Sequence, residues 1–353
     1  MKLCGVIVIE EGVWSGSTQD RRRVPALEDI ANRPILDHVL DAMLAARVAE
    51  VVIVSPAEVV GDIRDRVGAG ESRAGAAIQC LGLEEPVDFT AAMRLAAPIV
   101  GDGPCIVHRA TGLLDEPLGR FVTGLRDAPD VILVVHQPSS PDEHLSPATQ
   151  DMLHLAEFNA DHALGMAGVW LFGPGAFSTV ASSPWVSGED VDLTILGGRI
   201  ASAGGALHVE LANGWHQYRG DPLDLLELNR IVLDRLDSGF RRASTDGNRI
   251  EGRVWIHEAA SVRASVIVGP AVIGSGAHIS DAYIGPYTSI GERARVEGAE
   301  VERSIISAGA SVLHVGGRLV TSVVGRDARV FRDFSVPRAL RLRVGDGTEV
   351  ALS

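Results

Sequence analysis

The stretch Ser265–Gly285, SVIVGPAVIGSGAHISDAYIG, decides the fold of the second half of the chain. Its aliphatic residues Ile267, Ile273, Ile279 and Ile284 follow one another in steps of 6, 6 and 5 residues. A three-sided solenoid needs this arrangement, because each face of a coil turns one aliphatic side chain inward and each corner takes small or polar residues. The stretch therefore predicts a parallel β-helix built from hexapeptide repeats.

The same period of 17 residues runs through the neighbouring sequence in three columns. These columns are Val262, Ile279, Val296, Leu313 and Val330; Ile256, Ile273 and Ile290; and Ile267, Ile284 and Val301. An antiparallel β-sandwich is the alternative fold, but it does not predict a fixed period of this kind. The columns fade after Val330, and apolar residues at 340, 342 and 344 indicate a terminal cap.

The first half of the chain follows a different pattern, in which short apolar runs alternate with amphipathic helical segments. Strands are expected at 5–9, 51–54, 105–107, 131–135 and 169–172, and helices at 35–44 and 223–236. This alternation indicates a mostly parallel sheet covered by helices, which is a Rossmann-like α/β domain. We therefore expect an α/β domain at 1–236, a polar linker at 237–251, and a β-helix with a C-terminal cap at 252–353.

The composition is that of a globular protein of 353 residues, with 46% hydrophobic and 22% charged residues. A formal net charge of −14 argues against a free-standing nucleic-acid-binding protein, which would carry a basic face. Glu10 and Glu11 break the N-terminal apolar run, so no signal peptide is expected, and no run reaches the ~20 apolar residues of a membrane span. Cys4, Cys80 and Cys105 lack metal-ligand spacing and suggest buried free thiols in a reducing cytoplasm.

Several segments resemble the sugar-1-phosphate nucleotidyltransferases, in particular the long-form glucose-1-phosphate thymidylyltransferases with a C-terminal left-handed β-helix. Ile30–Leu40, IANRPILDHVL, is similar to the family motif P-V-x-x-K-P-I-L-x-H-V-L. Asp224–Arg230, DLLELNR, is similar to the family's D-L-L-E-A-N-R helix, and Ile284–Gly291 and Pro337–Leu342 resemble its solenoid and tail. The resemblance spans essentially the whole chain and implies the same fold, including the left-handed β-helix.

Members of this family transfer a nucleotidyl group from a nucleoside triphosphate to a sugar 1-phosphate. The reaction needs a glycine loop for the phosphates, an Arg, a Lys, and Mg²⁺ held by two Asp residues. Aligned on the Ile30–Leu40 segment, the leading loop glycines fall on Glu10 and Glu11, although Gly12 is kept, and the family's Arg and Lys fall on Ser15 and Pro25. Two carboxylates thus replace glycines where a triphosphate would lie. Each opposed charge pair at ~5 Å costs roughly 3 kcal/mol at an effective dielectric constant of ~20.

The two metal-binding Asp residues of the family are also replaced. Its G-D-N motif aligns with residues 110–112, so one Asp becomes Thr111, and its W-x-x-D-T-G motif aligns with residues 215–220, so the other becomes Tyr218. In the base-binding motif, Asp88 stands where the family has a glycine. The sequence therefore predicts no intact catalytic residue and no cofactor, and Mg²⁺ is expected only if the site has been rebuilt.

Other residues are candidates for ligand contact. Glu157 matches the family's sugar-contacting Glu, and Gly168 keeps the place of a family glycine. Four residues from the segments that meet at the family's metal site could form a new acid–base pair or an anion clamp: His108, Arg109, His216 and Arg219. The alternative is that these four line a solvent-filled cleft without a role. Nearby charged groups that could rebuild a site, although a solvated surface is the simpler interpretation, are Asp115, Asp221, Asp224 and Arg21–Arg23.

We therefore expect a cytoplasmic, catalytically inactive homologue, or pseudoenzyme, that acts in assembly or ligand sensing. An active nucleotidyltransferase with a rebuilt site is the alternative, and a new enzyme in the old cleft is a third interpretation. The expected ligand is a sugar phosphate or nucleotide sugar, and the expected partner is a second copy or an active paralogue, not nucleic acid or membrane.

Assembly through the solenoid is favoured by four outward-facing apolar residues, Val266, Val272, Tyr283 and Tyr287. A symmetric homo-oligomer, most simply a dimer, would cover them, and the resembled family also uses this half for oligomer contacts. The alternative is a monomer in which the α/β domain and the tail cover the solenoid.

Overall fold

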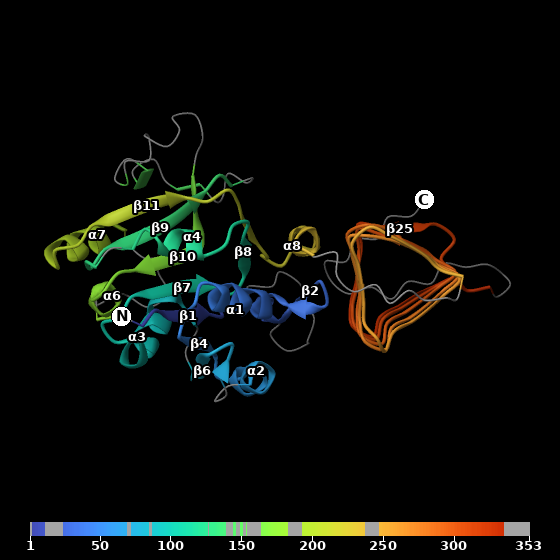
Figure 1. Cartoon of the computed structure of the whole chain (residues 1–353), viewed down its shortest axis with the longest axis horizontal. Coiled ribbons are helices and arrows are strands. Elements are labelled where there is room, and N and C mark those ends of the chain that lie inside the picture. The colour runs from blue at the N-terminus through green and yellow to red at the C-terminus, as the bar shows by residue number, and fades with distance from the viewer. Residues whose placement is uncertain are drawn as a thin grey trace. The chain divides into compact units, whose positions relative to one another are not determined.

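A computed structural model describes residues 2–10, 24–68, 72–84, 87–125, 127–138, 144–145, 149–150, 153, 164–182, 193–236 and 247–334. These residues form two compact units (Figure 1). The first unit holds the described chain up to Gln217, except for residues 28–34. Those residues belong to the second unit together with everything from Tyr218 onward, so the helix predicted near 223–236 is part of the second unit.

An eight-stranded sheet forms the centre of the first unit, in the order β11-β9-β10-β7-β1-β4-β6-β5. Neighbours among β1, β4, β6 and β7 pair in parallel, as do β9 and β11, whereas β10 runs antiparallel to β7 and β9 and β5 runs antiparallel to β6. The expected Rossmann-like, mostly parallel sheet is confirmed. Its strands are β1 Cys4–Val8, β4 Glu50–Pro56, β5 Ser72–Arg73, β6 Ala76–Leu83, β7 Cys105–Arg109, β9 Val131–His136, β10 Gly165–Phe172 and β11 Leu207–Leu211.

Helices cover both faces of this sheet. Alternate residues of β1, namely Cys4, Val6 and Val8, join an apolar cluster with α3, α6 and α7. On the opposite face, a Cβ added at Gly5 would meet the Met43 side chain of α1 at 3.2 Å. Burial on both faces explains why the strands read as continuous apolar runs. The helices of this unit are η1 Pro25–Leu27, α1 Ile35–Ala45, α2 Val60–Val67, α3 Phe89–Val100, α4 Gly119–Val122, α6 Ala176–Ala181 and α7 Leu193–Ser202, and a separate ladder pairs β8 Gly112–Leu114 with β12 Trp215–Gln217.

The second unit contains the predicted β-helix. Three five-stranded parallel sheets form its first face (β13, β16, β19, β22, β25), second face (β14, β17, β20, β23, β26) and third face (β15, β18, β21, β24, β27), which outline a triangle in Figure 1. The strands are β13 Arg249–Glu251, β14 Val254–Ile256, β15 Ser261–Arg263, β16 Val266–Val268, β17 Ala271–Ile273, β18 His278–Ser280, β19 Tyr283–Ile284, β20 Thr288–Ile290, β21 Arg295–Glu297, β22 Glu300–Glu302, β23 Ile305–Ile306, β24 Ser311–Leu313, β25 Arg318–Val320, β26 Val323–Val324 and β27 Arg329–Phe331.

The predicted columns are confirmed except at one position. Leu313 was expected in the column that follows Val296, but the structure pairs Val296 with Val312, which is fully buried, and leaves Leu313 half-buried. The register slips because the corner between Val301 and Ile306 takes a step of five residues, where the preceding coil takes six from Ile284 to Ile290. A longer step of seven, from Val312 to Leu319, then restores the phase.

The chain's own segments cover the second face of the solenoid. Helix α8, Pro222–Asp234, and the hairpin of β2 Asp29–Ile30 with β3 Arg33–Pro34 lie beside that face (Figure 1). Val272 of β17 packs against Leu233 and Ala31 and is 4% exposed, and Tyr287 packs on the same cluster. Val272 and Tyr287 are therefore not free contact surface, and the predicted oligomer retains only Val266 and Tyr283 of its four apolar residues.

Two further expectations from the sequence concern cysteines and membranes. Cys4, Cys80 and Cys105 are free and buried, as expected, and burial raises the pKa of each thiol. No helix in the part of the chain that the structure describes is long and apolar enough to cross a membrane.

The corrected register can be tested by matched substitutions at neighbouring positions. Val312→Asn buries an amide in the solenoid core and is expected to lower the free energy of unfolding by about 3 kcal/mol, whereas Leu313→Asn is expected to lower it by less than about 1 kcal/mol. Denaturant unfolding of the two variants measures the difference. The reverse order would show that the column runs through Leu313.

Candidate functional site

The residues that follow β1 and β7 meet at one edge of the sheet. These strands are parallel neighbours with Val8 opposite Arg109, so both chains leave the sheet at the same end. Glu10 follows β1, and its Oε1 lies 3.3 Å from Nε of Arg109, the last residue of β7. The guanidinium of Arg109 also lies 5.9 Å from the ring centroid of Phe89. An ion pair therefore occupies the edge at which the predicted phosphate loop begins.

This ion pair changes the expected electrostatics of the loop. The sequence predicted that the Glu10 carboxylate would repel a triphosphate. In the structure, Glu10 is 22% exposed and Arg109 is 33% exposed, and the two charges offset each other. An anionic ligand at this edge must compete with Glu10 for the guanidinium, because Arg109 already holds a carboxylate.

His108 lies just before Arg109 in β7 and is 1% exposed. Its Nδ1 lies 2.8 Å from the main-chain carbonyl oxygen of Arg109, which only accepts, so Nδ1 carries the proton and donates. Burial lowers the pKa of His108 to about 4. The ring stacks at a tilt on Trp215 of β12, with centroids 5.5 Å apart. A neutral imidazole at physiological pH adds no positive charge for an anion. Of the two neighbours His108 and Arg109, only Arg109 is therefore positively charged.

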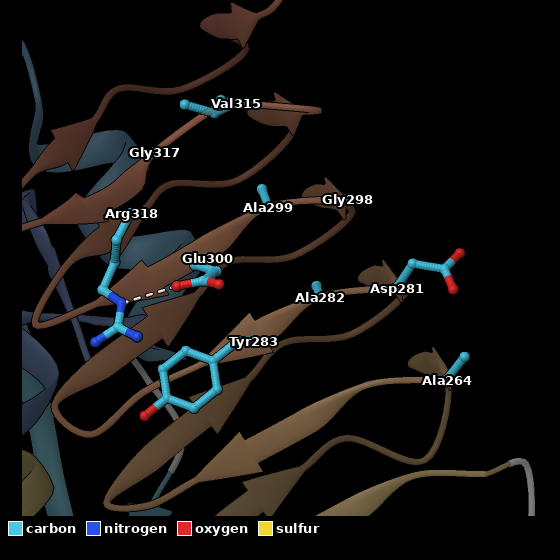
Figure 2. Close-up of a pocket in the computed structure, with 11 residues that line it drawn as sticks. Ala264, Asp281, Ala282, Tyr283, Gly298, Ala299, Glu300, Val315, Gly317 and Arg318 are labelled. Atoms are coloured by element: carbon cyan, nitrogen blue, oxygen red, sulfur yellow. Dashed lines mark hydrogen bonds and ion pairs between the residues drawn. The ribbon is translucent and has the colours of Figure 1, made fainter.

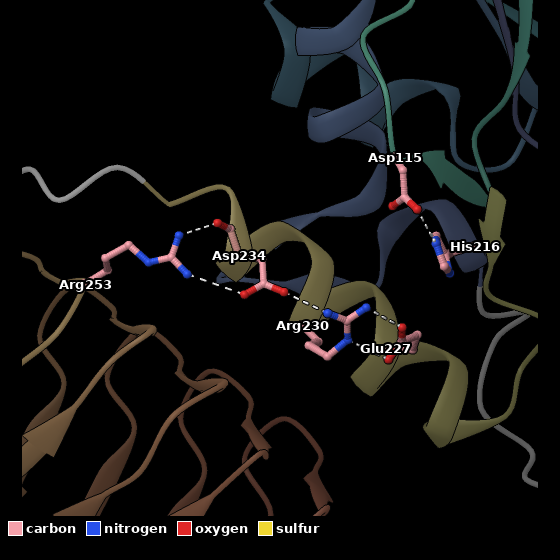
Figure 3. A network of polar contacts seen from close by, with 6 residues as sticks. All are labelled: Asp115, His216, Glu227, Arg230, Asp234 and Arg253. Carbon is pink, nitrogen blue, oxygen red and sulfur yellow. Dashed lines mark hydrogen bonds and ion pairs between the residues drawn. The ribbon is translucent and has the colours of Figure 1, made fainter. Parts of the chain in front are cut away.

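The β8–β12 ladder holds the position at which the first metal-binding Asp was expected. Thr111 is 6% exposed, and its Oγ1 accepts a hydrogen bond of 3.2 Å from Nε2 of Gln217. On the same ladder, Nε2 of His216 lies 3.2 Å from Oδ2 of Asp115 (Figure 3). Within the described ranges, no group of three or more His, Cys, Asp and Glu side chains could hold a metal ion. At this position Thr111 and Gln217 are neutral, so they offer no anionic oxygen to a divalent cation.

Other predicted site residues have local structural partners. Asp88 is the N-cap of α3, where Oδ1 accepts from the main-chain N–H of Ala91 at 2.6 Å and from Oγ1 of Thr90 at 2.8 Å. This cap explains an Asp at the position of a family glycine without invoking a ligand. Pro25 begins η1, where its fixed φ suits a first helical residue.

The remaining predicted residues are divided between the second unit and undescribed segments. Tyr218 and Arg219 belong to the second unit, in which Tyr218 is 5% exposed and Arg219 donates its main-chain N–H to Asp224 Oδ2 at 3.0 Å. The structure thus brings together Glu10, Arg109 and His108, and separately Asp115 with His216. Predicted residues outside the described part of the chain are Glu11, Gly12, Ser15, Arg21–Arg23 and Glu157.

Comparison with known proteins shows the family to which the chain belongs. No family model matches the chain. A glucose-1-phosphate thymidylyltransferase of Streptomyces griseus is 30% identical over 357 residues, which cover 97% of this chain and 99% of the relative. The chain belongs to the sugar-1-phosphate nucleotidyltransferase family. A second glucose-1-phosphate thymidylyltransferase, from Streptomyces antibioticus, is 29% identical over 331 residues that cover 92% of each chain.

The family fold also matches a solved structure. This structure, from Bacillus anthracis, is described as a candidate glucose-1-phosphate thymidylyltransferase in complex with sucrose. The match has a TM-score of 0.52 and 14% sequence identity, and it covers 68% of this chain and 98% of that one. At this identity the match supports the fold alone.

Gly168, which matches a family glycine, has a packing role in this member of the family. A Cβ added at Gly168 would lie 2.6 Å from Cζ2 of Trp215 and 3.0 Å from Cβ of Arg109. A Cβ added at Gly112 would lie equally close to the same indole. The Trp215 ring therefore fills the space above both glycines. The sequence analysis did not single out Trp215 as a site residue, although an aromatic residue in a family motif was the available signal.

A groove of about 640 Å³ on the solenoid shares no residue with this site. It follows the corner between the third and first faces, and the long step between Val312 and Leu319 supplies part of its wall. Figure 2 shows Arg318 above the Tyr283 ring, 5.0 Å from its centroid, with Nε donating to Glu300 at 3.0 Å. Nη1 of Arg318 donates to Glu302 at 3.0 Å. The groove thus holds its guanidinium in internal ion pairs.

The packing role of Gly168 can be tested against a matched glycine. Gly168→Ala forces a methyl group into the Trp215 ring and is expected to destabilise the protein by about 1–3 kcal/mol. Gly198→Ala, in α7 with no atom within 4 Å of the added Cβ, is expected to stabilise it by about 0.5–1 kcal/mol. Thermal unfolding of both variants measures the two changes in stability. Equal changes in the two variants would show that Gly168 does not pack against Trp215.

The buried imidazole of His108 predicts a pH dependence of stability. Its pKa falls from 6.5 to about 4 on folding, so the unfolded state binds the proton more tightly. Stability from this group is full above pH 6.5 and is lost as the pH falls toward 4, by roughly 3 kcal/mol for the whole shift. The free energy of unfolding, measured from pH 7 to 4, should decline less steeply in His108→Gln, and an unchanged slope in that variant would contradict the assignment.

Proposed function

We propose that this chain is a catalytically inactive member of the sugar-1-phosphate nucleotidyltransferase family that acts in assembly or ligand sensing. The observation that carries the proposal is the ion pair of 3.3 Å between Glu10 and Arg109. It lies where a strand of the sheet runs into the loop that binds phosphates in the family, and it supplies a carboxylate where the reaction needs donors for phosphate oxygens. The chain's own carboxylate thus neutralises the Arg109 guanidinium at the edge where that loop begins.

The metal positions support the same proposal. Phosphoryl and nucleotidyl transfer depend on a cation that neutralises the charge developing on the phosphate oxygens. Thr111 offers a neutral hydroxyl that already accepts from Gln217, and Tyr218 offers a phenol on a side chain that is 5% exposed. Neither group replaces a hard anionic ligand for Mg²⁺.

The segments that still resemble the family form a structural contact with each other. The two motifs that resemble the family most clearly, Ile30–Leu40 and Asp224–Arg230, contain Ala31 and Asn229. Oδ1 of Asn229 accepts a hydrogen bond of 2.8 Å from the main-chain N–H of Ala31, within the second unit. Retention of a structural contact beside loss of the reaction's charged groups favours a scaffold role over turnover.

The ligand and partner follow from the family. Relatives are named as enzymes for glucose 1-phosphate and mannose 1-phosphate, so a sugar phosphate or nucleotide sugar is the ligand class proposed for sensing. A second copy or an active paralogue is the proposed partner in assembly. Of the four apolar residues predicted for that contact, Val266 and Tyr283 remain, both half-buried on the first face of the solenoid.

The proposal is tested by assaying pyrophosphate release from each of the four common nucleoside triphosphates with glucose 1-phosphate and Mg²⁺. No release above a denatured-protein blank is expected, because the loop glycines, the Arg, the Lys and both metal-binding Asp residues are replaced. The Streptomyces griseus relative, assayed in parallel, is the positive control. Turnover that depends on Mg²⁺ would overturn the proposal.

A second candidate function is an active enzyme with a rebuilt site. The pair of His216 and Asp115, 3.2 Å apart on the β8–β12 ladder next to Thr111, is the observation that favours it, because such a pair can accept and return a proton. If turnover is found, Asp115→Asn and His216→Gln should each lower kcat by at least about 100-fold. His208→Gln is the matched control, because His208 pairs with Asp130 at 3.4 Å in β11. Equal losses in all three variants would count against the rebuilt site.

A further inference from the structure

A longer corner in the β-helix forms one wall of the groove between the third and first faces. Each of the three preceding corners steps three residues between these faces, whereas the corner from Leu313 to Arg318 steps five. Residues 315–317 of the longer corner line the groove, whose volume is about 640 Å³. This volume lies within the range of roughly 300–1,000 Å³ that is usual for small-molecule sites. The groove is therefore large enough for a small ligand.

Small residues and one aromatic ring line the rest of the groove. The small residues are Ala264, Ala282, Gly298 and Ala299. The half-buried Tyr283, which follows Ala282, supplies the one aromatic ring among the described residues that line the groove (Figure 2). An aromatic ring with small neighbours presents a flat apolar surface on which the C–H groups of a ring-shaped ligand can pack.

The groove also holds hydrogen-bond donors that other groups of the protein leave unused. The main-chain N–H groups of residues 315–317 donate to no other group in the described part of the chain. Arg318 donates through Nε to Glu300 and through Nη1 to Glu302, each at 3.0 Å, and no described group accepts from its Nη2. A ligand with hydroxyl oxygens can accept from these donors.

The charges around the groove favour an uncharged ligand over a phosphorylated one. The carboxylates of Asp281, Glu300 and Glu302 carry three negative charges. The guanidinium of Arg318 offsets one of them and that of Arg332, beside the longer corner, offsets another, which leaves a net charge of −1. A phosphate group would be repelled by this excess of carboxylates. Asp281 is exposed and pairs with no described cation, so its carboxylate can accept a hydrogen bond from a hydroxyl.

We propose that this groove binds an uncharged sugar. The C–H face of the sugar ring packs on Tyr283, and a sugar hydroxyl donates to Asp281. Other hydroxyl oxygens accept from the N–H groups of residues 315–317 and from Nη2 of Arg318. All of these groups belong to the second unit, and none belongs to the candidate site of the first unit. The proposal therefore holds whether or not the family's reaction is lost.

Saturation-transfer NMR on the full chain tests the proposal with three uncharged probes, glucose, galactose and mannose. At least one of them is expected to bind, and Tyr283→Ala is expected to weaken that binding at least about 10-fold, because the ring supplies the packing surface. Only binding that depends on Tyr283 is assigned to the groove, so a sugar held elsewhere on the protein does not count. Glucose 1-phosphate is expected to show no binding that depends on Tyr283, because the carboxylates repel its phosphate.

Two further variants separate loss of the site from a general effect of substitution. Val266→Ala is the matched control, because Val266 lies opposite Tyr283 in the same sheet but does not line the groove. It should bind the sugar within about 2-fold of the wild type. Asp281→Asn replaces one acceptor at an exposed position whose φ of 48° asparagine tolerates, and it should weaken binding about 3-fold or more.

Thermal unfolding of each variant confirms that it is folded before its binding is measured. The proposal is wrong if none of the three sugars shows binding that depends on Tyr283. It is also wrong if Val266→Ala loses as much affinity as Tyr283→Ala, or if Asp281→Asn binds as tightly as the wild type. Glucose 1-phosphate that binds more tightly than the uncharged sugars, in a way that depends on Tyr283, would overturn it as well.

Discussion

Parallel strands deliver the residues that follow them to one edge of the sheet, and in this chain that constraint joins Glu10 to Arg109 across 3.3 Å. The parallel pairing of β1 with β7 places the two residues at the same end of the sheet. The two opposite charges neutralise each other, and both side chains are partly buried. The guanidinium of Arg109 also packs over the Phe89 ring. The electrostatics of this edge follow from this contact, because the guanidinium of Arg109, at the end of β7, is already paired with a carboxylate.

The polar side chains near this ion pair also form hydrogen bonds with other groups of the protein. His108 is neutral and donates to a main-chain carbonyl, Thr111 accepts from Gln217, and Asp88 caps α3. Trp215 fills the space above Gly112 and Gly168. In an enzyme of this family, such groups would have to contact nucleotide, metal or sugar. In this chain each contacts another group of the protein, which is the physical basis for proposing a scaffold that has left the family's reaction.

The sequence predicted the architecture well because burial leaves a periodic signal. A solenoid repeats one coil, so Ile267, Ile273 and Ile279 could be placed on three faces from spacing alone. The prediction at Leu313 was wrong because a fixed period assumes corners of constant length. The chain shortens one corner and lengthens another, so Val312 is the residue that points inward. Likewise, no periodicity could reveal that α8 and residues 28–34 cover the second face, because this contact joins residues about 200 positions apart, such as Ala31 and Asn229.

Site residues were harder to assign than elements. Alignment to the family motif placed Glu10 correctly at the end of β1, but only the strand order shows that Arg109 is its partner. Asp88 looked like a lost glycine in a base-binding motif, and the structure shows a helix cap. A motif assigns a position, whereas the partner of a side chain depends on which strands are neighbours and on what is buried against them.

A crystal of the full chain soaked with a nucleoside triphosphate and Mn²⁺ tests the central claim most directly, since Mn²⁺ is located by its anomalous scattering. The account predicts that the Glu10–Arg109 ion pair stays intact and that no anomalous peak appears beside Thr111. A triphosphate bound to Arg109 in place of Glu10, with a Mn²⁺ peak next to Thr111, would contradict it.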